Sequence, residues 1–116
     1  IEFSAESSLG SAVTSVLTRA TGKGTAVPCF TLSDIVARTG LASVDIIKAD
    51  IEGSEYWAFS DAGFFSKHHP TLIFEPALNS IRETNLEAIT ELLRGHGYSV
   101  TLHEQVGSRL PLVVCA

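Results

Sequence analysis

The sequence contains no methionine, only two cysteines and few positively charged residues. Cys29 and Cys115 lie far apart without the paired spacing of metal ligands, so neither a disulfide framework nor a zinc site is indicated. Eight Lys and Arg against thirteen Asp and Glu give a net charge of −5, and the absence of a basic cluster argues against a nucleic-acid partner. No apolar run approaches the roughly 20 residues that span a bilayer. We therefore expect a cytoplasmic protein without a membrane span.

The composition is typical of one globular domain. The 116 residues suffice for a single domain, 45% of them are hydrophobic, and the charged fraction of 18% is below the usual value of about 25%. The chain opens on Ile1-Glu2-Phe3, which has the pattern of a strand and no initiator methionine. We therefore expect the chain to be a piece of a longer protein.

The chain divides into a loose segment at residues 4–26 and an α/β unit at residues 27–116. Ser, Thr, Gly and Ala dominate the first segment, as they do in loops. The second is predicted to begin with a helix that Thr31 or Ser33 caps and that Gly40 ends. The apolar face of this helix would comprise Leu32, Ile35 and Val36.

Two apolar strands are predicted in the middle of the chain. Residues 44–50 are β-branched and apolar, which is typical of a strand covered on both faces. The turn at residues 50–53 leads into a predicted helix at residues 54–65, and His68-His69-Pro70 precedes the second strand at residues 71–75. The bulky residues of this helix, which we expect to be mostly buried, are Tyr56, Trp57, Phe59 and Phe64.

The last part of the sequence predicts a helix and two strands. Ser80 to Glu83 has capping-box spacing, and Gly95 or Gly97 would end the helix that follows. Its apolar face comprises Leu86, Ile89, Leu92 and Leu93. The short connector between the strands at residues 98–104 and 110–115 requires an antiparallel pair. The whole order predicts an α/β fold with parallel strands, right-handed crossovers, flanking helices and a reversed last strand.

Acidic residues follow both middle strands, where ligands bind in open α/β sheets. Asp50 ends the first strand, Glu75 ends the second, and Glu52 lies in the turn before Gly53. Carboxylates there are costly unless they are solvated, hydrogen-bonded or paired with a cation. They could hold a divalent cation such as Mg²⁺, or one could take a proton from a hydroxyl while another orients the ligand.

Structural roles are the alternatives for the same residues. Glu52 and Glu55 would favour a helix start through their negative charge. Lys48 and Asp50 share a face of the strand and could form an ion pair.

The remaining reactive residues are weaker candidates. His68, His69 and His96 are predicted at the opposite edge of the sheet, as surface residues, whereas His103 lies near the end of a strand and is retained as a candidate base. Tyr56 and Trp57 could stack on a ligand ring, although core packing is the more common role of such residues. No base accompanies either cysteine, so nucleophilic catalysis is unsupported.

The run at residues 44–59, VDIIKADIEGSEYWAF, resembles the FkbM-type methyltransferases, whose signature is approximately D-x-I-K-[ILM]-D-[VI]-E-G-x-E. Segments around it are similar to other family motifs in the same order. They are Thr31-Leu32-Ser33-Asp34-Ile35, Leu72-Ile73-Phe74-Glu75, and Leu92-Leu93 through Gly97-Tyr98. The resemblance covers residues 27–100. The departures are Ser33 for the usual Asp, Ala49 for a larger aliphatic residue, and Trp57-Ala58-Phe59 for a Val-Leu pair.

The resemblance implies a Rossmann-like, S-adenosylmethionine-dependent methyltransferase that usually acts on oxygen. Asp50 and Glu52 would contact the cofactor, with Asp50 near the sulfonium and the attacking hydroxyl, and Asp50 and Glu75 would be the catalytic residues. The family's Gly-rich loop and ribose-binding acid have no counterpart, since Gly22-x-Gly24 follows no predicted strand. The main cofactor-binding motif is therefore absent from this chain.

These expectations combine into one leading hypothesis and two alternatives. The chain would be the C-terminal half of an O-methyltransferase domain, inactive alone, whose acceptor is a small molecule, sugar or lipid. The alternatives are a cation-dependent, phosphate-handling α/β enzyme and a non-catalytic interaction domain. An unpaired sheet edge would favour self-association.

Overall fold

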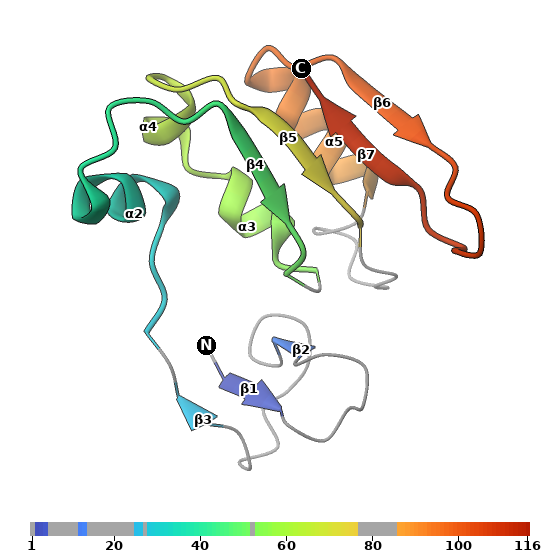
Figure 1. The fold of residues 1–116 in the computed structure, drawn as a ribbon, viewed down its shortest axis with the longest axis horizontal. Coiled ribbons are helices and arrows are strands. Elements are labelled where there is room, and N and C mark those ends of the chain that lie inside the picture. Colours follow the sequence, from blue (N-terminus) through green and yellow to red (C-terminus); the bar gives the residue numbers. More distant parts are fainter. Residues whose placement is uncertain (1, 5–11, 14–24, 27, 52, 77–85) are drawn as a thin grey trace.

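The computed structural model describes residues 2–4, 12–13, 25–26, 28–51, 53–76 and 86–116. The first three of these segments form a small antiparallel sheet in the order β2-β1-β3 (Figure 1). Its strands are β1 (Glu2–Ser4), β2 (Ala12–Val13) and β3 (Thr25–Ala26). The strand expected at the start of the chain is therefore present. Within residues 4–26, which are expected to be loose and loop-like, the structure describes the short strands β2 and β3, and both pair with β1 through their backbones.

A four-stranded sheet organises the rest of the described chain, in the order β4-β5-β7-β6 (Figure 1). Its strands are β4 (Ile46–Ala49), β5 (Thr71–Phe74), β6 (Val100–His103) and β7 (Leu112–Cys115). β4 and β5 are parallel, whereas β7 runs antiparallel to both β5 and β6. The prediction of a mixed α/β fold with a reversed last strand is confirmed, and that strand lies between β5 and β6.

Local capping determines helix α2 (Leu32–Thr39). The Thr31 hydroxyl accepts the Asp34 N–H at 3.1 Å, and the Asp34 carboxylate accepts the Thr31 N–H at 3.0 Å. Gly40 ends the helix in the left-handed region, with φ of 70°, where a side chain would be strained. The predicted boundaries are confirmed, and of the predicted apolar face Leu32 and Val36 are half-buried whereas Ile35 is exposed.

The single helix predicted at residues 54–65 is wrong. The structure has two short helices, α3 (Glu55–Phe59) and α4 (Ala62–Phe65). The break occurs at Asp61, whose carboxylate accepts the Phe64 N–H at 3.0 Å and thereby starts a new helix. Ser33, from α2, holds the same carboxylate through its N–H at 2.7 Å and its hydroxyl at 2.9 Å. Because Ser33 and Asp61 are 28 residues apart, no pattern of neighbouring residues predicts this contact.

Helix α5 (Leu86–Gly95) has the predicted apolar face and packs with α3 on one side of the sheet (Figure 1). Gly97 follows with φ of 90°, and the chain then enters β6. The predicted capping box at residues 80–83 lies outside the described residues.

The core lies between these helices and one face of the sheet. Its strand residues alternate along β5 and β7, as half-covered strands require. Phe59 of α3 and Phe74 of β5 meet edge to face at 5.2 Å between ring centroids. The most deeply buried core side chains are Phe59, Phe64, Leu72, Phe74, Ile89, Leu93, Val113 and Cys115.

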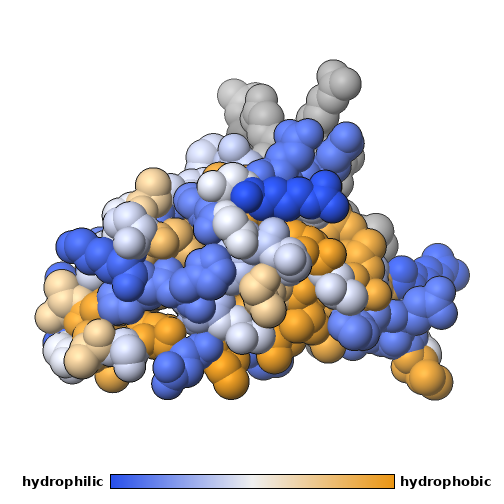
Figure 2. Space-filling view, turned by 90° about the horizontal axis from the view of Figure 1, so that it is seen from above, coloured by the Kyte–Doolittle hydropathy of each residue, from blue (hydrophilic) through white to orange (hydrophobic). Residues whose placement is uncertain are grey.

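The opposite face of the sheet is uncovered within the described residues. β4 is an edge strand, and its Ile46 is 63% exposed, so the expectation that this strand is covered on both faces is wrong. The described helices α3 and α5 cover only the other face. Viewed from above, the surface mixes hydrophobic and hydrophilic side chains (Figure 2).

Candidate active site

The carboxyl ends of β4 and β5 bring Asp50 and Glu75 to the same edge of the sheet. The parallel register pairs Ala49 with Phe74, and the two acidic residues follow these partners directly. Neighbouring parallel strands therefore end in carboxylates at the edge where α/β sheets bind ligands. This is the placement predicted from the sequence, while the chemical roles of both residues stay predictions.

Asp50 is accessible and is engaged only weakly by Lys48. The Lys48 Nζ lies 3.9 Å from an Asp50 carboxylate oxygen, and the two side chains are 72% and 69% exposed. The ion pair considered from the sequence is therefore present. Exposed pairs of this kind contribute about 0–1 kcal/mol, so the contact does not prevent Asp50 from turning to a ligand.

The turn after Asp50 is tight, and its backbone is held by hydrogen bonds. Gly53 has φ of 95°, a conformation that side chains rarely adopt, and it is buried. The Ser54 N–H donates to the Ile51 carbonyl at 3.2 Å. Glu52, the other predicted cofactor contact, lies outside the described residues.

The sequence predicts a role for Glu55 at the helix start, and the structure adds a second role. Its side chain is fully buried, and its Oε1 accepts the Ile51 N–H at 3.4 Å. A buried carboxylate is costly unless polar groups surround it. Since Ile51 follows Asp50, Glu55 supports the turn that carries the accessible acid. The signal in the sequence was its place in the K-x-D-x-E-G-x-E string.

Glu75 is half-buried and held by Gln105, a residue that no sequence motif indicated. Gln105 Nε2 donates to Glu75 Oε2 at 3.1 Å and to the Leu110 carbonyl at 3.1 Å. Gln105 lies on the connector between β6 and β7, 30 residues from Glu75. Only the antiparallel return of β7 beside β5 brings this connector to the acidic edge.

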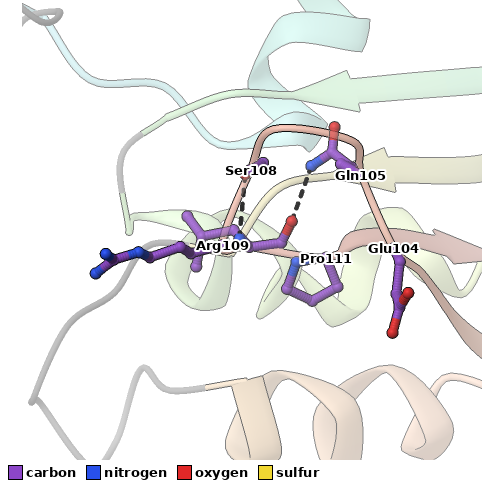
Figure 3. Close-up of a pocket in the computed structure, with 6 residues that line it drawn as sticks. Glu104, Gln105, Ser108, Arg109 and Pro111 are labelled. Carbon is purple, nitrogen blue, oxygen red and sulfur yellow. Dashed lines mark hydrogen bonds between the residues drawn. The ribbon is translucent and has the colours of Figure 1, made fainter.

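The same connector lines a cavity of about 280 Å³ that is open to solvent on one side (Figure 3). The residues that line it are Glu104, Gln105, Ser108, Arg109, Leu110 and Pro111. A smaller cavity of about 160 Å³ lies between α2 and α4, away from both acids, with Ser33 and His68 among its lining residues.

Three of the four histidines contact aromatic rings near the opposite edge of the sheet. His68 stacks on Phe64, His69 on Tyr98 and His96 on Phe65, with ring centroids 4.9, 4.0 and 4.6 Å apart. His96 Nε2 also donates to the Phe59 carbonyl at 2.9 Å, because a carbonyl can only accept. His68 and His96 are half-buried, so the prediction that they lie at the surface is wrong for these two, whereas His69 is exposed as predicted.

The other candidates differ in exposure. His103 is exposed at the end of β6, opposite Leu112. Trp57 is 52% exposed, so the prediction that it is buried is wrong, and Tyr56 meets it edge to face at 5.4 Å. Both cysteines are free, and burial raises the pKa of Cys115 to about 11.

Among the residues that the structure describes, no group of three or more His, Cys, Asp and Glu side chains is arranged to hold a metal ion. No helix among the described residues is long and apolar enough to cross a membrane.

Comparison with known protein families gives a match to a methyltransferase domain. The model of the methyltransferase FkbM domain matches residues 1–100, which extends the resemblance found at residues 27–100 to the start of the chain. No curated protein and no solved structure matches significantly.

Proposed function

The chain belongs to the FkbM methyltransferase domain family, and on that premise we propose that it forms the C-terminal half of an S-adenosylmethionine-dependent O-methyltransferase. The acceptor is a hydroxyl group of a small molecule, sugar or lipid. The observation that carries the proposal is the pair of carboxylates, Asp50 and Glu75, at the ends of the adjacent parallel strands β4 and β5.

The two acids have environments suited to different tasks. Asp50 is exposed, so it can accept the proton of a hydroxyl that attacks the methyl group or orient that hydroxyl. Glu75 is half-buried and held by Gln105, so its orientation is fixed before a ligand binds. Positioning of donor and acceptor supplies much of the rate enhancement when the donor is already reactive.

The donor chemistry fits this acidic edge. S-adenosylmethionine, when bound, supplies a methyl group on a positively charged sulfonium. Carboxylates complement such a charge, and we assign Asp50 and Glu52 to the donor side of the site. Glu55 supports the backbone between them by accepting the Ile51 N–H.

The test is methyl transfer from radiolabelled S-adenosylmethionine to a panel of hydroxylated acceptors, with the full-length protein. Replacement of Asp50 by Asn removes the proton acceptor but keeps the shape, and we expect kcat to fall about 100-fold or more. The matched control is Asp45→Asn, an exposed acid just before the opposite end of β4, which should stay within about twofold of wild type.

Two results would refute the proposal. Undiminished transfer by the Asp50→Asn variant would leave the acidic edge without a catalytic role and favour an interaction domain. No transfer to any acceptor, together with tight Mg²⁺ binding in calorimetry without an adenosyl ligand, would favour the cation-dependent, phosphate-handling enzyme.

A further inference from the structure

The connector between β6 and β7 has a shape that its own hydrogen bonds hold. The Ser108 N–H donates to the Gln105 carbonyl at 3.3 Å, and the Leu110 N–H donates to the Ser108 hydroxyl at 3.1 Å. The Gln105 side chain closes the loop by donating to the Leu110 carbonyl at 3.1 Å (Figure 3). The cavity of about 280 Å³ is therefore formed before any ligand binds.

Gln105 joins this cavity to the acidic edge. A carboxamide nitrogen carries two hydrogens, and those of Gln105 reach the Leu110 carbonyl inside the connector and the Glu75 carboxylate outside it. One side chain thus lines the cavity and also holds Glu75. The residues matched to the family model end at residue 100, so that match assigns nothing to this connector.

The chemistry of the lining selects one class of ligand. Gln105 contributes its amide oxygen and Ser108 its hydroxyl to the lining, whereas the Arg109 guanidinium extends away from the other lining residues (Figure 3). An acyl chain would remove water from these groups without replacing their hydrogen bonds. Glu104 is the acidic residue of the lining, and with the Arg109 guanidinium directed away from it (Figure 3), the lining offers no cation that would favour a phosphate. The volume is close to the lower limit of small-molecule pockets, which suits a single sugar ring.

We propose that this cavity is the subsite for a neutral, polyhydroxylated part of the acceptor, of monosaccharide size, and that Gln105 is a positioning residue that couples this subsite to Glu75. The inference rests on the proposed function, because it names the class of acceptor for that site. A sugar ring held by the connector lies next to the carboxylate that Gln105 orients. Loss of Gln105 therefore weakens acceptor binding and also disturbs Glu75.

The kinetic test compares variants of the full-length protein with a sugar-type acceptor. Gln105→Leu keeps the size of the side chain and removes both hydrogen bonds. We expect the acceptor KM to rise about tenfold and kcat to fall, while the KM for S-adenosylmethionine stays within twofold. Val106→Ala is the matched control, since Val106 is the next residue, is fully exposed and does not line the cavity. Unchanged acceptor KM and kcat in Gln105→Leu would refute the inference, and so would an equal rise in both KM values.

A binding test needs no catalysis. Saturation-transfer NMR with methyl glycosides should give a signal that is reduced at least about fivefold by Gln105→Leu and unaffected by Val106→Ala. Equal signals from all three proteins, or stronger Gln105-dependent binding of inorganic phosphate or a fatty alcohol, would overturn the subsite. Gln105-dependent glycoside binding without methyl transfer would refute the proposed function alone. Methyl transfer that does not depend on Gln105 would refute the subsite alone.

Discussion

Replacement of Asp61 tests how the helices beside the sheet are held. Its Oδ1 accepts the Phe64 N–H at 3.0 Å and the Ser33 hydroxyl at 2.9 Å, and its Oδ2 accepts the Ser33 N–H at 2.7 Å. Asp61→Ala removes the N-cap of α4 and both links to α2. Loss of an N-cap costs about 1 kcal/mol, and exposed hydrogen bonds to a charged group add a comparable amount. We expect the free energy of unfolding to fall by about 2 kcal/mol in urea denaturation.

The charge of Asp61 gives this prediction a pH dependence. Burial acts to raise the pKa of the carboxyl, but hydrogen bonds from Ser33 and Phe64 outweigh it, and the pKa lies below the ordinary value of 3.8. The folded state thus favours the charged form. The stabilisation that the charged Asp61 carboxylate gives to the folded state is fully present above pH 3.8. It is lost as the pH falls below that value through the folded-state pKa of Asp61.

Asp61→Asn separates the cap from the charge. Asparagine also caps helices, but its amide nitrogen cannot accept the Ser33 N–H, so we expect a loss of about 1 kcal/mol near neutral pH. The difference between wild type and Asp61→Asn should be constant from pH 5 to pH 7 and should shrink below pH 3.8. A difference that grows in acid, or an Asp61→Ala variant within 0.5 kcal/mol of wild type at pH 7 (roughly the noise of a surface change), would contradict the reasoning.

Two further predictions concern buried groups. Glu55→Gln keeps an oxygen that can accept the Ile51 N–H, whereas Glu55→Leu does not. Methyl transfer should therefore fall at least about tenfold more in the Leu variant than in the Gln variant. Hydrogen exchange at the Ile51 amide should accelerate only in the Leu variant. Equal behaviour of the two variants would show that Glu55 does not support this turn. Cys29 is exposed and Cys115 is buried with its pKa raised to about 11, so peptide mapping after iodoacetamide treatment at pH 8 should find Cys29 alkylated at least about 100-fold faster. Comparable rates in the native protein would refute the burial of Cys115.

Local interactions explain what could be predicted from the sequence. Thr31, Asp34 and Gly40 determine where α2 begins and ends, because the capping hydrogen bonds join residues three or four positions apart. The sequence likewise predicted the strands β5, β6 and β7, and the helical spacing of its apolar residues predicted the apolar face of α5. Asp50 and Glu75 could be placed at one edge of the sheet because each directly follows one of two consecutive parallel strands.

Contacts between distant residues explain what could not be predicted. Asp61, whose local cap starts α4, is also held by Ser33, 28 residues before it, and Glu75 is held by Gln105, 30 residues after it. Trp57 is exposed because α3 turns it away from the core, which bulk and hydrophobicity alone do not reveal.

The sequence by itself determined helix α2, the four strands of the larger sheet and the acids that end two of those strands, since each depends on neighbours within a few residues. The tertiary structure decided which strand lies at the sheet edge, which acid is buried and which side chain holds Glu75. Those outcomes depend on how β7 returns between β5 and β6, and that return brings together groups whose separation along the chain leaves no periodic signal.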